Sequence, residues 1–133
     1  MLQNAPSLGM PSESLSNYII SIHQSYIESS AVLSIYMLST GKSGRGITFK
    51  NAFQLFYRDF YRLFAVTEEM KILPRDSAER RKIQDWFKRG KGILDLAKTD
   101  KQKALDFAEE GLELSKQWIS ILYSKQIIQT MRN

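Results

Sequence analysis

Apolar residues recur at intervals of three or four along most of the chain, and no stretch shows the strict alternation typical of a β-strand. This interval keeps one side of an α-helix apolar, because a helix makes one turn in about 3.6 residues. Only three prolines occur in 133 residues, so long stretches are free to be helical. The pattern therefore restricts the chain to an all-α fold.

Residues that favour helix ends divide the first half of this pattern into two helices. The first begins at Ser12 or Ser14, whose side chains can cap a helix, and stops at Gly41. The second follows Thr48, a further capping residue, and ends before Pro74. Residues 1–11 have no hydrophobic period and are expected to form a short irregular N-terminal tail or linker.

Two further helices follow in the second half. Capping boxes at Asp76–Glu79 and Thr99–Gln102 predict where they begin. Gly90 and Gly92 weaken the third helix, which either breaks there or uses the glycines to pack closely against a neighbour. Because the connections are short, we expect residues 12–133 to form one domain, an antiparallel four-helix bundle.

The charges are distributed unevenly along this pattern. Between Ser14 and Gly41 the only full charge is Glu28, whereas most of the 19 lysines and arginines fall between Lys42 and Lys103. The formal net charge is +5. An almost neutral helix followed by a basic segment indicates two contact surfaces, one for protein and one for a polyanion.

The basic residues of the middle segment are the candidate nucleic-acid-binding residues. In the second helix they belong to a row with four-residue steps beside tyrosines, a pattern that can follow a phosphate backbone while rings stack on bases. The row is Lys50, Gln54, Arg58 and Arg62. In the third helix Arg81 and Lys88 are seven residues apart and face the same way, and the same spacing relates Lys82 to Arg89. The full set is Lys42, Arg45, Lys50, Arg58, Arg62, Arg80, Arg81, Lys82, Lys88, Arg89 and Lys91.

No motif in the sequence names a reaction. The segment 41–43 (Gly-Lys-Ser) lacks the earlier glycine and the preceding strand that a phosphate-binding P-loop requires. Asp106 and Glu110 are the best metal candidates, but the Glu-x-x-His pairs of a di-iron bundle are absent, and helix dipoles explain acids near a helix start. His23 has no carboxylate beside it, and the chain has no cysteine. We therefore expect no enzymatic activity, no metal and no cofactor.

Small size, four helices, the absence of cysteine, a basic middle segment and a linker-like start together resemble the small helical subunits of CRISPR effector (Cascade-like) complexes. The resemblance covers residues 12–131 at the level of architecture. It implies a non-enzymatic subunit of an antiviral nucleoprotein complex, stacked in several copies, that guides crRNA and target strand by backbone contacts. Four-helix coat proteins of DNA-wrapping filamentous viruses share most of these traits.

These observations favour a non-catalytic subunit of a nucleoprotein complex that holds the backbone of RNA or single-stranded DNA without reading its sequence. Its protein partners, with copies of itself among the candidates, would contact the first helix and apolar parts of the fourth. The alternative is a protein-interaction bundle, such as an adaptor, assembly chaperone or coat protein, whose basic face is solvated or paired with acids of the fourth helix. Residues 15–38 are too polar to span a membrane and no signal peptide is visible, so we expect a cytoplasmic protein without membrane contact.

Overall fold

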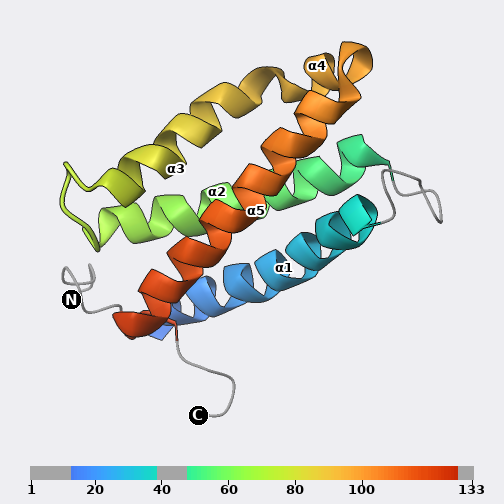
Figure 1. Ribbon diagram of the computed structural model, residues 1–133. Coiled ribbons are helices and arrows are strands. Elements are labelled where there is room, and N and C mark those ends of the chain that lie inside the picture. The colour runs from blue at the N-terminus through green and yellow to red at the C-terminus, as the bar shows by residue number, and fades with distance from the viewer. Residues whose placement is uncertain (1–12, 39–47, 129–133) are drawn as a thin grey trace.

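The computed structural model describes residues 13–38 and 48–128, which contain five α-helices and one short 3-10 helix. The long helices run in alternating directions and form an antiparallel four-helix bundle in which α5 crosses over α2 (Figure 1). The all-α fold class is therefore confirmed. The elements are α1 (Glu13–Leu38), α2 (Phe49–Glu69), α3 (Ala78–Arg89), η1 (Gly90–Gly92), α4 (Ile93–Thr99) and α5 (Lys101–Ser124).

The first two helices begin and end near the predicted places. The Oγ1 atom of Thr48 accepts a hydrogen bond from the backbone N–H of Asn51 at 3.1 Å, which caps α2 as the sequence predicts. α2 ends at Glu69, before Pro74. The predicted tail, the cap candidate Ser12 and the stop at Gly41 lie outside the described residues.

Two predicted caps are wrong by one residue. Ser77, not Asp76, caps α3, and Asp100, not Thr99, caps α5. Each side-chain oxygen accepts from the backbone N–H three residues later, at 3.3 Å for Ser77 and 3.1 Å for Asp100. A cap must occupy the last residue before the helical conformation begins, and in both cases that place falls one residue beyond the predicted one.

Both sequence alternatives for the two glycines are realised. The third predicted helix is interrupted at Gly90–Gly92, where η1 separates α3 from α4. Gly90 is also buried, and a Cβ added there would lie 2.6 Å from Cε2 of Tyr57. A Cβ at Gly92 would meet no atom within 4 Å. The first glycine thus permits close packing against α2, while the second lies in open space.

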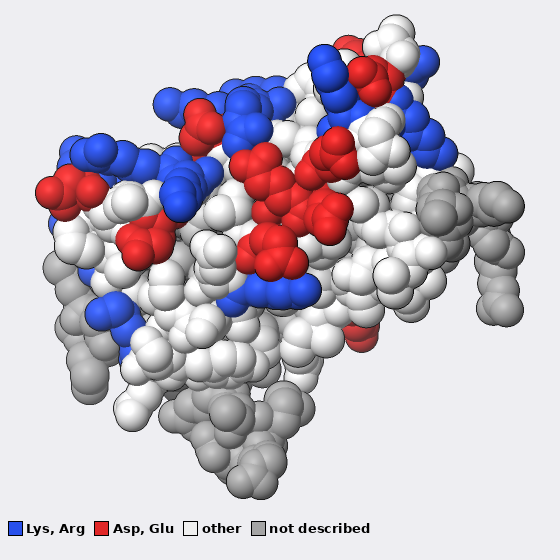
Figure 2. Space-filling model, viewed as in Figure 1, with Lys and Arg blue, Asp and Glu red and all other residues white. Residues whose placement is uncertain are grey.

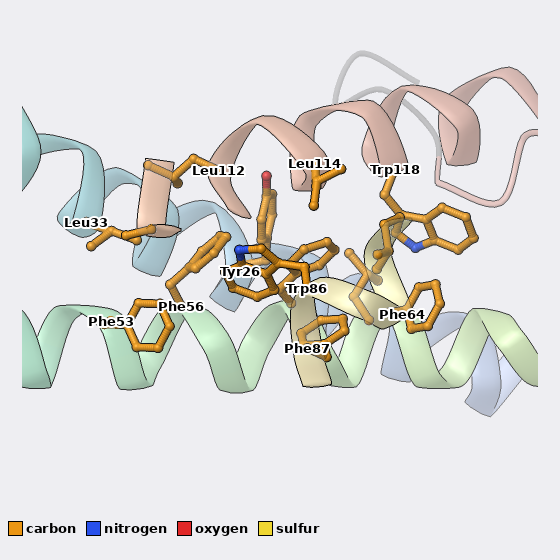
Figure 3. Close-up of a cluster of buried hydrophobic side chains, with 14 of the residues drawn as sticks. Tyr26, Leu33, Phe53, Phe56, Phe64, Trp86, Phe87, Leu112, Leu114 and Trp118 are labelled. Atoms are coloured by element: carbon orange, nitrogen blue, oxygen red, sulfur yellow. The ribbon is translucent and has the colours of Figure 1, made fainter. Parts of the chain in front are cut away.

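Aromatic rings from α1, α2, α3 and α5 fill the core, and Figure 3 shows several of them together. Trp86 of α3 is completely buried and stacks on Phe107 of α5, with ring centroids 4.8 Å apart and an angle of 6°. Its Nε1 donates to the backbone oxygen of Phe107 at 2.9 Å. α5 can approach this ring because it carries Gly111, where a Cβ would overlap the indole. The predicted apolar stripe of the second helix is buried as expected: Phe53, Phe56, Phe60 and Phe64.

None of the helices in the described part of the chain combines the length and the apolarity needed to cross a membrane.

Candidate nucleic-acid interface

A groove of about 460 Å³ opens between α2 and the end of α3. Aromatic side chains come from both helices, and two lysines come from α3 and η1. Its volume lies in the range of small-molecule sites, roughly 300–1,000 Å³. We call it the aromatic groove; its lining residues are Tyr57, Tyr61, Phe64, Ala65, Glu68, Gln84, Phe87, Lys88 and Lys91.

The two tyrosines of the groove differ: Tyr57 is held by a hydrogen bond, whereas Tyr61 is exposed. The hydroxyl of Tyr57 donates to the backbone oxygen of Phe87 at 2.7 Å, and burial raises the pKa of Tyr57, so this group stays a neutral donor. Tyr61 meets Phe87 edge to face, with centroids 5.3 Å apart and an angle of 90°. An edge-to-face contact occupies at most one face of a ring, and 53% of Tyr61 is exposed. A face of the Tyr61 ring is therefore open to a ligand.

Two exposed cations line this groove, and two more lie at neighbouring helix positions. Lys88 and Lys91 line it, and Arg81 shares the face of Lys88 because it lies seven residues earlier on the same helix. Arg62 stands on α2 three residues before Ala65, which is a neighbouring position on a helix surface. None of the four forms an ion pair with another described residue. We call Arg62, Arg81, Lys88 and Lys91 the groove cations.

Arg58 has a structural partner as well as an exposed position. Its Nε lies 3.2 Å from Oδ1 of Asp59, whose side chain is almost completely buried, while 48% of the arginine side chain is exposed. Ser25 of α1 donates to Oδ2 of the same carboxylate at 2.8 Å. Arg58 therefore compensates a buried charge where α1 meets α2. It also neighbours Tyr61, which lies three residues later on α2.

Arg80 is engaged within the bundle. Its Nε donates to both carboxylate oxygens of Glu68, at 2.7 and 2.9 Å, and its Nη1 donates to the backbone oxygen of Arg75 at 3.0 Å. The pair joins α3 to the end of α2. Glu68 lines the aromatic groove, so this contact also compensates the negative charge there.

Arg89 is held on the opposite side of α3. Its guanidinium contacts Asp85 at 2.8 Å and Glu110 of α5 at 2.8 Å, and it lies over the ring of Phe107. The predicted alternative, pairing with acids of the last long helix, is therefore confirmed for this residue. Lys82 lies seven residues earlier and shares this side. Figure 2 shows acidic side chains gathered over α5, next to basic side chains over α3.

Lys50, the remaining predicted cation among the described residues, lies toward the other end of α2. Lys50 lines a second groove, of about 640 Å³, together with Lys98 and Lys101. These two lysines were not among the predicted residues, because only the turn of the chain at η1 and α4 brings them near the start of α2. The positions outside the described residues are Lys42 and Arg45.

The acids of α5 and His23, considered above as metal or catalytic groups, take part in local contacts. Asp106 accepts from the Gln102 side chain at 2.9 Å, and within 13–38 and 48–128 no three histidine or acidic side chains group as metal ligands. The dipole explanation for the acids of α5 is wrong, because the first turn of this helix carries none. His23 is buried with Nε2 3.4 Å from the hydroxyl of Tyr123, and burial lowers its pKa.

α1 presents apolar side chains on both sides. Opposite its buried face, four large residues are exposed, with Ile35 at 65% and Leu38 at 83%. Ile20, Ile27 and Leu38 are spaced by seven and eleven residues, which places them on one line along the helix. The surface over α1 carries few charges in Figure 2. We call Ile20, Ile27, Ile35 and Leu38 the apolar α1 stripe.

Two serines of α1 form hydrogen bonds within the bundle. Ser25 binds Asp59, and the buried Ser29 donates to the backbone oxygen of Tyr26 at 3.3 Å. Ser25 therefore joins α1 to α2, whereas Ser29 bonds within α1. The apolar α1 stripe remains a surface without a described neighbour.

No protein-family model matches the sequence, and comparison with curated proteins and with solved structures gives no match either. The groove with its cations and the apolar α1 stripe are therefore the two features from which a function is assigned.

Proposed function

We propose that this protein is a non-catalytic subunit of a nucleoprotein complex that holds the backbone of RNA or single-stranded DNA without sequence specificity. The binding surface is the α2–α3 side of the bundle. The observation that carries the proposal is an aromatic groove lined by Lys88 and Lys91, with Arg62 and Arg81 at neighbouring helix positions. None of these four exposed groove cations forms an ion pair with another described residue. A role in a CRISPR effector complex is supported by the resemblance to its small helical subunits.

Ion pairing decides which arginines and lysines count toward this surface. Arg80 and Arg89 would each have to leave a carboxylate at 2.7 to 2.8 Å before they could bind a phosphate. The groove cations need not exchange one partner for another. Four phosphate contacts on a single strand predict a slope of about −3 for the logarithm of affinity against the logarithm of salt. Affinity should then fall about 50-fold between 50 and 200 mM salt.

A fluorescence anisotropy titration with labelled oligo-U and oligo-dT over this salt range tests the proposal. We expect the double charge reversal Arg62→Glu with Lys88→Glu to lower affinity at least tenfold. The matched control reverses two exposed lysines that form no ion pair with another described residue, Lys103→Glu in α5 with Lys125→Glu just after it, and should lower the affinity much less. Arg58 is left intact because its loss would leave the buried Asp59 carboxylate without its ion-pair partner.

Three outcomes would contradict the proposal: no binding at 50 mM salt, binding that is insensitive to salt, or equal losses in the two double variants. Melting temperatures of both variants should stay close to that of the wild type. The groove cations make no ion pair that the reversal could break, so a loss of affinity would report on binding rather than on folding.

A second function, docking to protein, is favoured by the apolar α1 stripe. A line of exposed apolar side chains is typical of a protein contact surface, and α1 has a described neighbour only on its buried side. If copies of the chain associate here, Ile27→Asp with Ile35→Asp should convert an oligomer to a monomer in native mass spectrometry. Leu55→Asp, at an exposed apolar position of α2, is the control. A wild-type protein that stays monomeric at high concentration would contradict self-association.

A further inference from the structure

We infer that the aromatic groove receives an unpaired nucleobase, stacked on Tyr61, so that the protein prefers single strands to duplexes. This inference rests on the proposed function, because the groove cations bring the strand to the groove. It adds a contact to the base itself, which backbone binding does not require.

The walls of the groove are held in place before any ligand arrives. Phe87 is the common neighbour: its centroid lies 5.3 Å from those of Tyr57 and Tyr61 and 5.8 Å from that of Phe64. The Tyr57 ring is further fixed by its hydrogen bond to the Phe87 backbone. A preformed site loses little conformational freedom on binding, which favours affinity.

The exposed Tyr61 ring is suited to an unpaired base. Stacking uses the face of a ring, and every base has such a face, so this contact is strong without being sequence-specific. In a duplex both faces of an internal base are covered by its neighbours, and only its edges are accessible. A flat ring beside a groove of about 460 Å³ therefore selects strands whose bases can turn out of the stack.

The charges around the groove fit the phosphates that flank such a base. Lys88 and Lys91 are both exposed in its lining, and Arg62 is exposed on α2 three residues before Ala65 of the lining. The carboxylate in the lining, Glu68, is compensated by Arg80 at 2.7 Å and does not repel a strand as a free acid would. An apolar floor with a cationic rim matches a base attached to a phosphate chain better than it matches an acidic peptide.

The decisive probe is a strand without bases. We expect the wild type to bind oligo-dT or oligo-U about 5- to 150-fold more tightly than an abasic oligomer of equal length, the ratio that corresponds to stacking of one base. Tyr61→Ala should abolish this ratio, and Tyr61→Phe should retain it. Tyr18→Ala is the matched control, since Tyr18 on α1 is 51% exposed against 53% for Tyr61, and it should change nothing.

The outcomes separate this inference from the proposed function. Equal, salt-dependent affinity for the oligonucleotide and the abasic strand would overturn base stacking and leave backbone binding intact. Loss of affinity for both strands in Tyr61→Ala, or equal competition by poly-glutamate, would also overturn it. Absence of salt-dependent binding to either strand would remove the proposed function itself. The oligo-U and oligo-dT arms distinguish RNA from DNA as the preferred strand.

Discussion

Replacing Gly111 by alanine tests the closest approach between α3 and α5. In a helix interior alanine is favoured over glycine by about 1 kcal/mol, so helix propensity alone predicts a more stable protein. The new Cβ, however, would overlap three carbons of the Trp86 indole. That ring is completely buried, stacks on Phe107 and donates to its backbone oxygen at 2.9 Å, so it has no free direction in which to move.

The magnitudes predict that the overlap wins. Overpacking of a filled core costs about 1–3 kcal/mol, and a lost hydrogen bond adds about 1 kcal/mol. After the gain in helix propensity, Gly111→Ala should lower the free energy of unfolding by about 1–3 kcal/mol. For a domain of this size that lowers Tm by roughly 4–12 °C. Thermal unfolding followed by far-UV circular dichroism measures the change.

The same substitution at Gly92 is the control. No atom lies within 4 Å of a Cβ there, and the backbone has φ of −105°, which alanine adopts without strain. We expect Tm to stay the same or to rise by a few degrees. If Gly111→Ala raised Tm as well, Trp86 would not be pressed against the backbone of α5. The orientation of α3, and with it the wall of the aromatic groove, would then have no such anchor.

Three further predictions concern buried polar groups. Burial lowers the pKa of His23 below its ordinary value of 6.5, so the unfolded chain binds a proton on acidification before the folded chain does. The free energy of unfolding should therefore fall as pH drops from about 7 to about 5, by at most about 1.4 kcal/mol per pH unit. In urea titrations at several pH values, His23→Gln should lack this part of the pH dependence. An unchanged pH dependence would exclude His23, the single histidine, as its source. Tyr26→Phe removes a hydroxyl 2.7 Å from Oγ of Ser115 and should cost about 1 kcal/mol in urea unfolding, whereas a neutral result would mean that the bond adds no net stability. Ser25→Ala removes a donor to the buried Asp59 carboxylate, and a loss of about 1.5–3 kcal/mol is expected in the same assay; a loss below 0.5 kcal/mol would indicate that water replaces the hydroxyl.

The sequence predicts the helices well because each one depends on a signal carried within its own segment. The apolar interval in α2 predicts its buried stripe, and Thr48 predicts its start. The predicted caps of α3 and α5 are wrong by one residue because two adjacent side chains can serve as the cap in each case. The backbone conformation decides between them. Gly111 could not be singled out, since a glycine in a helix shows its purpose only when a neighbouring helix is in place.

The candidate site is only partly predictable for a similar reason. Sequence identifies every arginine and lysine, and the spacing correctly groups Arg81 with Lys88. It does not show which side of α3 faces α5, because that depends on the rotation of the helix about its axis. Nor does it show that Arg80 meets Glu68, twelve residues earlier, because that contact requires the turn between α2 and α3.

The rotation of α3 is itself set by its two adjacent aromatic residues. Trp86 packs against Phe107 of α5, and Phe87 packs against the tyrosines of α2. Arg89 lies three residues after Trp86 and is carried toward the acids of α5, whereas Lys91 lies four residues after Phe87 and is carried into the aromatic groove. A rotation by one residue, about 100°, would move both cations away from these positions. The core thus divides one basic segment into residues that pair with acids of the same chain and residues that remain available to a ligand.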